Sequence, residues 1–236
     1  MIDTVLFDLD GTLLPMDQDA FVRTYLGLLA RYMEEYGFEP GRLMQTMGEG
    51  IRAMVANDGS RTNEEAFWQV FRDAFGPQTE AAREVLEQFY ASEFIKARVT
   101  CGFAPEAGEL IRRLKEKGIR VVLATNPLFP RTATMQRIRW AGLDQEDFEL
   151  VTTYEAECFC KPNPEYYRAI LAKLQLDPGR CVMVGNDAVE DLAAEEAGME
   201  VFILTGCLLH GEALEGRTCP SGGFDALNVY LNTKMQ

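Results

Sequence analysis

Short apolar runs alternate with segments of helical periodicity over the second half of the chain. The runs that have the length and β-prone composition of buried strands lie at 4–9, 119–124, 148–153, 181–184 and 199–204. Segments with helical spacing of apolar residues lie at 105–117, 131–140, 164–174 and 189–197. Because strands joined through helices make right-handed parallel connections, this alternation predicts an α/β fold with a parallel sheet covered by helices on both faces.

The segment from about 17 to 94 has a different pattern. Apolar residues such as Phe21, Tyr25 and Leu28 recur at helical spacing, and turn-like stretches divide the segment into about four helices with no strand between them. We therefore predict an all-helical domain at 15–96, inserted into a core made of 1–14 and 97–236. The tail beyond 205 is weakly patterned and has room for an edge strand and a last helix.

Composition and charge narrow the function classes. Hydrophobic residues make up 47% of the chain, enough for a packed core, and 23 basic against 37 acidic residues give a net charge of −14. Such a surface repels the phosphate backbone of nucleic acids. The acidic N-terminus does not resemble a signal peptide, and no apolar run approaches the roughly 18–20 residues of a membrane span. We expect a cytoplasmic protein without nucleic-acid or membrane partners.

Cysteine and histidine usage gives little support to zinc or histidine chemistry. Six cysteines in a chain of this kind are expected to be reduced thiols rather than a disulfide framework. Cys158 and Cys160 are too closely spaced for a zinc knuckle. The single histidine, His210, lies in a glycine-rich segment far along the chain from every other signal, so we predict a surface loop there.

Polar residues that suit phosphate chemistry follow the first two predicted strands. Asp8 and Asp10 stand two residues apart at the end of the first strand, where like charges on one side are costly unless a cation lies between them. Magnesium, which prefers oxygen ligands, would meet that need. Thr125 and Asn126 end the next strand, at the edge where α/β sheets bind ligands, and both can hydrogen-bond phosphoryl oxygens.

Two further polar groups complete the pattern. Lys161 stands between prolines that pin its backbone at a helix entrance, and lysine suits phosphate as a compact charge. Asp187 follows the 181–184 strand and would supply the other side of a metal site, with Asp191 free to brace Lys161. Each motif alone also fits ordinary turns, loops or helix starts, but all four fall at the ends of predicted parallel strands. The sequence therefore predicts one site.

Four segments resemble motifs of the haloacid dehalogenase-like (HAD) hydrolase superfamily. They are DLDGT at 8–12, ATN at 124–126, CKPNP at 160–164 and VGNDAVED at 184–191. The resemblance covers the core and implies a Rossmann-like sheet. The helical insert is similar to the α-helical cap that the phosphatase branch carries between its first and second motifs.

The resemblance also implies roles for the residues. Asp8 would be the nucleophile that forms an aspartyl-phosphate, and Asp10 would be the general acid and base. Thr125, Asn126 and Lys161 would bind the phosphoryl group of a phosphorylated small molecule, with Lys161 and Thr125 counted among the catalytic residues. Mg²⁺ would be held by Asp8, by the Asp10 backbone carbonyl and by an acid of the fourth motif.

The fourth motif departs from the family's pattern. Many relatives have Gly-Asp where this chain has Gly185 and Asn186, and the acid comes one residue later, at Asp187. Asn186 could ligate through its carbonyl oxygen. We favour Asp187 as the metal ligand because a divalent ion gains more from a carboxylate.

Several alternatives on the same scaffold remain to be compared. Asp10 argues against a dehalogenase, because a halide leaves without a proton, and the lack of any lysine over 1–95 argues against a phosphonate-cleaving relative. A phosphosugar mutase remains the runner-up, followed by a non-catalytic phosphate-binding or regulatory protein.

The helical insert contains arginines at positions 23, 31, 42, 52, 61, 72 and 83. One or two of them are candidates to reach a substrate carboxylate or a second phosphate. The sequence fixes neither the ester nor the oligomeric state.

Overall fold

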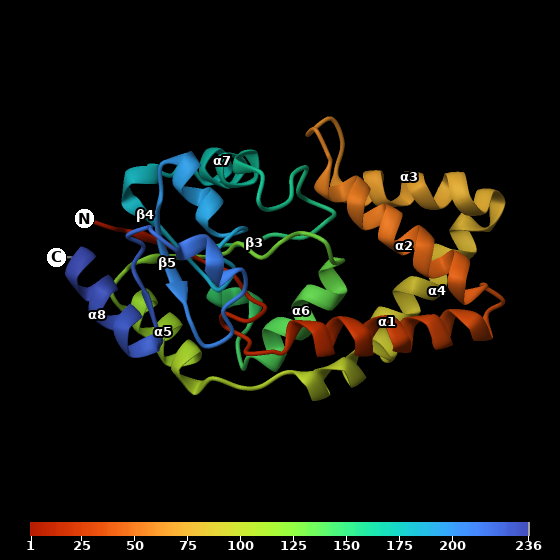
Figure 1. Cartoon of the computed structure of the whole chain (residues 1–236), viewed down its shortest axis with the longest axis horizontal. Coiled ribbons are helices and arrows are strands. Elements are labelled where there is room, and N and C mark those ends of the chain that lie inside the picture. Colours follow the sequence, from red (N-terminus) through yellow and green to blue (C-terminus); the bar gives the residue numbers. More distant parts are fainter. Residues whose placement is uncertain (236) are drawn as a thin grey trace.

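A computed structural model of the chain describes residues 1–235 and confirms the predicted α/β class. It places a sheet-containing core at one end and a bundle of helices at the other (Figure 1). The strands are β1 (Thr4–Phe7), β2 (Arg120–Leu123), β3 (Leu150–Val151), β4 (Cys181–Gly185), β5 (Glu200–Leu204) and β6 (Ser221–Gly222). The helices of the core are α5 (Pro105–Glu116), α6 (Arg131–Trp140), α7 (Pro164–Leu174) and α8 (Phe224–Lys234). Short 3₁₀ helices lie at Gly76–Gln78, Phe94–Thr100, Gln145–Asp147, Pro178–Arg180, Leu192–Ala197 and Gly211–Leu214.

The sheet is a Rossmann-like arrangement of parallel strands in the order β3-β2-β1-β4-β5-β6. The first strand of the chain is therefore central, with β2 on one side and β4 on the other. Phe7 at the end of β1 is level with Leu123 of β2 and with Val184 of β4. The residues that follow these three strands consequently meet at one edge of the sheet.

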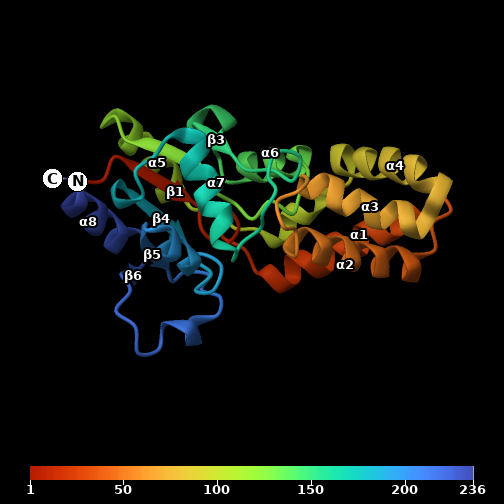
Figure 2. The same ribbon diagram turned by 90° about the horizontal axis from the view of Figure 1, so that it is seen from above.

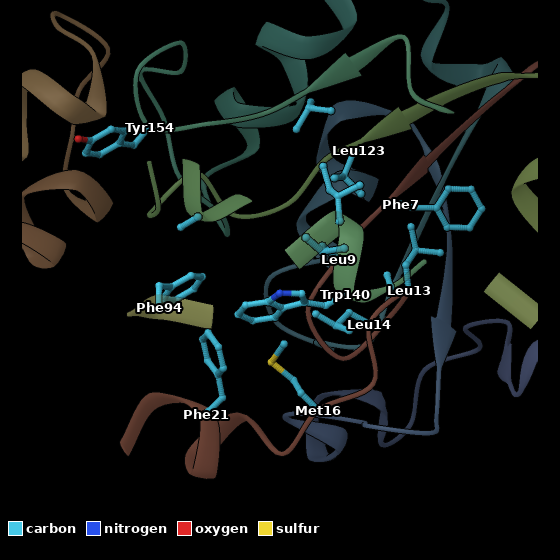
Figure 3. Packing of buried hydrophobic residues seen from close by; sticks show 14 of the residues in the cluster. Phe7, Leu9, Leu13, Leu14, Met16, Phe21, Phe94, Leu123, Trp140 and Tyr154 are labelled. Carbon is cyan, nitrogen blue, oxygen red and sulfur yellow. The ribbon is translucent and has the colours of Figure 1, made fainter. Parts of the chain in front are cut away.

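Alternate side chains of the strands enter two hydrophobic cores. Val5 and Phe7 of β1 face the core that α5, α6 and α8 cover, whereas Leu6 faces the core beneath α7. This alternation is the ordinary consequence of the two-residue period of a strand. The first core continues into the helical part of the molecule, where Trp140 of α6 stacks on Phe94 with ring centroids 5.2 Å apart (Figure 3).

Four helices between β1 and β2 form what we call the helical unit: α1 (Gln18–Glu35), α2 (Pro40–Val55), α3 (Asn63–Phe75) and α4 (Thr79–Ser92). Local signals define their starts. The side chain of Asp17 accepts a hydrogen bond from the Ala20 N–H at the start of α1, and Thr62 and Glu65 form a reciprocal capping box at the start of α3. The unit lies at the end of the molecule opposite the two chain termini (Figures 1 and 2).

The helical unit is joined to the core along two seams. The two connecting segments run side by side, because Gly102 N–H donates to the Pro15 carbonyl at 2.7 Å and Met16 bridges to Cys101. On the other side, Asn63 at the start of α3 donates its backbone N–H to the Glu157 carbonyl at 2.8 Å. The Asn63 side chain is fully buried and donates to Cys160 Sγ at 3.3 Å.

Two predicted elements differ from those observed. The strand expected at 148–153 is reduced to Leu150–Val151 at the edge of the sheet. The helix expected at 189–197 is a 3₁₀ helix that begins at Leu192, because the Asp187 carboxylate accepts hydrogen bonds from the Val189 and Glu190 N–H groups and holds that segment in a turn. The tail does supply an edge strand, β6, and a last helix, α8.

The six cysteines are free thiols, and only Cys160 and Cys181 are buried. Within residues 1–235, no helix has the combination of length and apolar character that a bilayer span requires.

Candidate active site

The ends of β1, β2 and β4 enclose what we call the acidic cavity, with a volume of about 110 Å³. Five carboxyl side chains line it, and the lining residues are Asp8, Asp10, Gln18, Thr125, Asn126, Leu128, Phe129, Asn186, Asp187, Glu190, Asp191 and Leu209. The structure thus brings together five of the six residues that the sequence singled out as catalytic, binding or metal-ligating. Lys161, the sixth, lies behind Asp8 in the wall of the cavity.

Glycines at two strand ends make the close packing of this site possible. Gly11 has φ +81°, and a Cβ on it would lie 2.3 Å from the Asn186 Nδ2 atom. A Cβ on Gly185 would lie 1.9 Å from an oxygen of Asp191. Only glycine leaves room for these contacts, so the first motif can turn against Asn186 and Asp191 can lie beside the end of β4.

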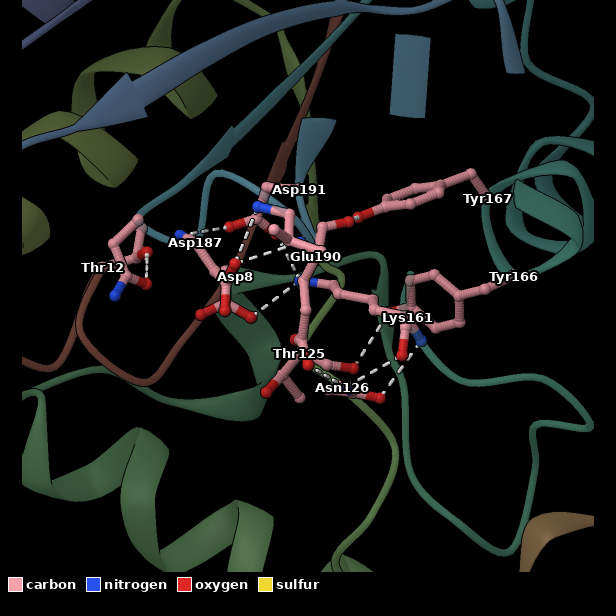
Figure 4. A network of polar contacts seen from close by, with 12 residues as sticks. Asp8, Thr12, Thr125, Asn126, Lys161, Tyr166, Tyr167, Asp187, Glu190 and Asp191 are labelled. Atoms are coloured by element: carbon pink, nitrogen blue, oxygen red, sulfur yellow. Dashed lines mark hydrogen bonds and ion pairs between the residues drawn. The ribbon is translucent and has the colours of Figure 1, made fainter. Parts of the chain in front are cut away.

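Lys161 is buried and ion-paired with two carboxylates. Its Nζ atom lies 2.8 Å from Asp8 Oδ1 and 2.7 Å from Asp191 Oδ1 (Figure 4), which confirms that Asp191 braces the lysine. Burial by itself lowers the pKa of the Lys161 ammonium, but Asp191 and Asp8 outweigh it and raise that pKa well above its ordinary value. The lysine is therefore charged, and it contacts Asp8 rather than the open cavity.

Asp10 is held by a buried arginine that the sequence did not single out. Arg137 of α6 is almost completely buried, pairs with Asp10 Oδ2, and lies 4.2 Å from the ring centroid of Phe129. The other oxygen of Asp10 is buried and has no hydrogen-bond partner. Burial raises the pKa of the Asp10 carboxyl although Arg137 and Lys161 oppose the shift. A raised pKa favours the protonated carboxyl, the form that can donate a proton.

The other acids of the cavity are also poorly solvated. Burial raises the pKa of Asp8 to about 7, against the opposing charge of Lys161, and raises the pKa of Glu190 to about 8. Two cations, Lys161 and Arg137, contact this group of five carboxyl side chains. The site therefore has more negative than positive groups.

Thr125 and Asn126 link the end of β2 to the rest of the site. The Thr125 carbonyl accepts hydrogen bonds from Thr152 Oγ1 at 2.6 Å and from the Tyr166 hydroxyl at 2.9 Å, which fixes the backbone and leaves the Thr125 side chain at the cavity. Both polar ends of the Asn126 side chain are engaged, since Oδ1 accepts from the Lys161 N–H at 3.2 Å and Nδ2 donates to Glu190 at 2.8 Å. In this arrangement Asn126 connects the second, third and fourth motifs.

Comparisons with known proteins agree with this geometry. A sequence model of the haloacid dehalogenase-like hydrolase family matches residues 2–198. The chain belongs to the haloacid dehalogenase-like hydrolase family. It is therefore an enzyme, and the predicted family is confirmed.

Individual relatives extend over nearly the whole chain. The protein CbbY of Cereibacter sphaeroides is 26% identical over 228 residues, covering 92% of this chain and 90% of that protein. A phosphoglycolate phosphatase of Caulobacter vibrioides is 27% identical over 199 residues, covering 83% and 76%. The crystal structure of a 2-haloacid dehalogenase from Pseudomonas syringae superimposes with a TM-score of 0.66 at 22% identity, covering 99% of both chains, and shares the fold.

The fourth motif of this hydrolase brings Asn186 and Asp187 to the same cavity. Asn186 Oδ1 accepts from the Thr12 hydroxyl at 2.9 Å, and its Nδ2 donates to the Cys207 carbonyl at 2.7 Å. Asp187 Oδ1 accepts from His210 Nδ1 at 2.9 Å in addition to the two backbone N–H groups of its turn. The choice of Asp187 as metal ligand stays a prediction.

His210 lies in an exposed loop, as predicted, but it is not remote from the site. Leu209 pairs with the fourth motif through backbone hydrogen bonds to Asn186 and Ala188, and this brings the His210 ring against Asp187. Its hydrogen bond to Asp187 raises the pKa of the His210 ring. The tail, to which the sequence assigned no role, thus closes one side of the acidic cavity with Leu209.

The donor set suits a hard divalent cation such as Mg²⁺. The carboxyl groups of the cavity outnumber its cations, and one oxygen of Asp10 has no hydrogen-bond partner. Burial disfavours the ionised form of Asp8, so a cation bound beside it would stabilise that form. Among residues 1–235, no group of three or more His, Cys, Asp or Glu side chains is arranged as a metal cluster. A site with two carboxylates, a main-chain carbonyl and water is consistent with both findings.

Sequence reasoning missed several residues of the site, among them Arg137, Gln18 and Phe129. Arg137 comes from a helix that was predicted only as sheet cover, and nothing in its local pattern marks it as functional. Gln18 and Phe129 belong to the start of α1 and to the loop after β2. A carboxylate pair near a strand end could have suggested a search for a buried cation, but it does not identify which arginine.

Proposed function

We propose that this hydrolase is a magnesium-dependent phosphatase that acts on a small phosphorylated metabolite through an aspartyl-phosphate on Asp8. The observation that carries the proposal is the pairing of Asp8 with Lys161 beside Asp10 in one acidic cavity. The family supports hydrolysis, and relatives named as phosphatases support phosphate esters as the substrate class.

The chemistry follows from the roles of three side chains. An Asp8 oxygen attacks phosphorus, the bond from phosphorus to the ester oxygen breaks, and Asp10 gives its proton to that oxygen. Asp10, now ionised, takes a proton from water as the water attacks phosphorus, which releases inorganic phosphate and restores Asp8. Lys161 holds Asp8 in place and offsets its charge.

The proposed cofactor would be held by Asp8, the Asp10 backbone carbonyl and Asp187. When bound, Mg²⁺ supplies positive charge for the phosphoryl oxygens. Thr125 provides a hydroxyl for these oxygens, with Asn126 holding the neighbouring segments in register. We further propose that residues 15–96 act as a cap that excludes bulk water, because Gln18 of α1 lines the acidic cavity.

Release of inorganic phosphate from acetyl phosphate tests the proposal. We expect turnover with Mg²⁺, none with excess chelator, and none in Asp8→Asn. A phosphorylated protein trapped from the wild type and absent from the variant would identify the intermediate. Turnover that survives Asp8→Asn would refute the assignment of the nucleophile, and turnover that survives chelation would refute the role of the metal.

A further inference from the structure

A second cavity, which we call the apolar cavity, adjoins the acidic one. It has a volume of about 150 Å³ and lies between the helical unit and the loops that follow β2 and β3. Its lining residues are Gln18, Val22, Tyr25, Leu26, Met47, Ile51, Phe67, Leu86, Tyr90, Leu128, Phe129, Pro130 and Tyr154. The two cavities share Gln18, Leu128 and Phe129 among their lining residues, so they lie next to each other.

The described residues that line the apolar cavity include none that carries a charge. Three tyrosines contribute hydroxyls, but these are already partnered. The Tyr25 and Tyr90 hydroxyls bond to each other at 2.6 Å, and the Tyr154 hydroxyl accepts from Trp68 Nε1 at 3.3 Å. The tyrosines therefore present mainly their ring surfaces to the cavity.

The arginines of the helical unit do not reach either cavity. None of the seven lines the acidic or the apolar cavity in the described chain. Arg83 instead pairs with Glu64 at 2.7 Å and lies over Trp68, and Arg42 lies over Phe75. The nearby Arg137 is already paired with Asp10 and does not line the apolar cavity. A carboxylate or a second phosphate placed there would be buried without a cation among the lining residues, which is strongly unfavourable.

The apolar cavity is too large to be an ordinary packing defect. Protein interiors contain few voids larger than a water molecule, and an apolar void of about 150 Å³ has room for a benzene ring. Rings of Tyr25, Phe67 and Phe129 are among its walls, and such surfaces pack favourably against a further aromatic ring. Apolar walls beside a few polar groups are also the usual form of a small-molecule site.

We propose that the apolar cavity binds the leaving group of the substrate, and that this group is an uncharged aromatic alcohol. The inference rests on the proposed phosphatase function and specifies its substrate class. The phosphoryl group lies in the acidic cavity, the aromatic ring lies against Phe129 and the helical unit, and the ester oxygen lies between them near Gln18.

Selectivity among three phosphate compounds tests the substrate class. Benzyl phosphate carries the proposed leaving group, phosphoglycolate carries a carboxylate instead, and acetyl phosphate has no group large enough to fill the apolar cavity. We expect kcat/KM for benzyl phosphate to exceed that for phosphoglycolate by about 100-fold or more, since one methylene in an apolar pocket is worth about 10- to 200-fold. Equal values, or a preference for phosphoglycolate, would overturn the inference.

A variant at the rim locates the subsite. Val22 lines the apolar cavity and is 38% exposed, so Val22→Trp can fill the cavity without burying a new group in the core. We expect the ratio of kcat/KM for benzyl phosphate to that for acetyl phosphate to fall by about ten-fold or more. The matched control is Val55→Trp on α2, at a valine that is 44% exposed and lines neither cavity; it leaves the ratio unchanged. An unchanged ratio in Val22→Trp would overturn the inference.

A binding measurement separates this inference from the proposed function. If the wild type does not hydrolyse acetyl phosphate, that result counts against the proposed phosphatase function and not against binding of a ring in the apolar cavity. The dissociation constant of benzyl phosphate is then measured by calorimetry in the Asp8→Asn protein, with and without Val22→Trp. We expect the second change to weaken binding by about ten-fold, and equal affinities would show that the ring does not occupy the apolar cavity.

Discussion

The acidic and apolar cavities adjoin each other, but they are built from different parts of the chain. Carboxyl side chains at the ends of β1 and β4 give the acidic cavity its character, whereas one or a few apolar residues from each of α1, α2, α3 and α4 line the apolar cavity. The strand ends are fixed by backbone pairing within the sheet. Most of the helical residues that line the apolar cavity also belong to the hydrophobic core, so their positions are set by helix packing. The sheet therefore determines where the carboxyl groups lie, and the packing of the helices determines the shape of the apolar cavity.

The largest effect is expected from removing Lys161, the cation that pairs with two acids of the acidic cavity. Lys161→Met leaves Asp8 and Asp191 buried without their partner. We expect kcat/KM for acetyl phosphate to fall by about 10³-fold, comparable with the loss of a principal charge-stabilising donor in other enzymes. We also expect the free energy of unfolding to fall by about 3–5 kcal/mol, the usual result of breaking a buried pair.

Lys96→Met is the control for this change, because Lys96 is an exposed lysine that pairs with Glu93 at the surface. Both proteins are assayed below their melting transitions, which are followed by circular dichroism. Near-normal activity in folded Lys161→Met would contradict the role given to the acidic cavity.

A smaller loss is expected when Asp10 is left without its arginine. Arg137→Met removes the partner of Asp10 Oδ2, so the carboxyl is less well positioned to protonate the ester oxygen. We expect kcat/KM for benzyl phosphate to fall by about 10- to 100-fold, part of the roughly 10²–10⁴-fold that general acid catalysis contributes.

The leaving group distinguishes positioning from a loss of structure. Aryl phosphates whose phenols are strong acids need little protonation, so kcat/KM for them should fall less in Arg137→Met. Arg139→Met, at an exposed arginine of the same helix, is the control. The same loss for every ester would mean that Arg137 does not act through Asp10.

The smallest effect is expected at the seam between the helical unit and the core. Asn63→Ala removes a fully buried amide that bonds to Asn57 at 2.9 Å and to Cys160 at 3.3 Å. Because buried groups lose their partners, we expect the free energy of unfolding in urea to fall by about 1–3 kcal/mol. The control is Asn232→Ala, at a surface asparagine that accepts a hydrogen bond from Lys117. Equal effects of the two changes would show that the buried contacts of Asn63 at the seam do not contribute to the free energy of unfolding.

The difference between the two cavities also explains which parts of the site the sequence could predict. The parallel sheet and the joint position of Asp8, Thr125 and Asp187 follow from local patterns, because a residue just after a parallel strand must lie at one edge of the sheet. Arg137 could not be predicted in this way, since its contact with Asp10 depends on how α6 packs. The lining of the apolar cavity depends similarly on which turn of each helix faces the core loops.

The fourth motif illustrates a failure of a different kind. Its acids, including Glu190 and Asp191, look from their spacing like the first turn of a helix at 189–197. Asp191 instead bonds to Lys161, and Asp187 closes a turn over the following residues. The turn closed by Asp187 takes the place of the expected first helical turn, and the bond of Asp191 to Lys161 spans 30 residues; local spacing indicates neither contact.

The central place of β1 in the sheet also has a consequence for the order in which the molecule is made. A ribosome makes β1 and Asp8 before both neighbours of the strand, because β2 and β4 come from much later in the chain. The helical unit is complete at Ser92, and its helices can pack on one another while β1 has no partner. Asp8 is thus made long before Lys161, Asp191 and the Leu209 segment that complete the acidic cavity around it.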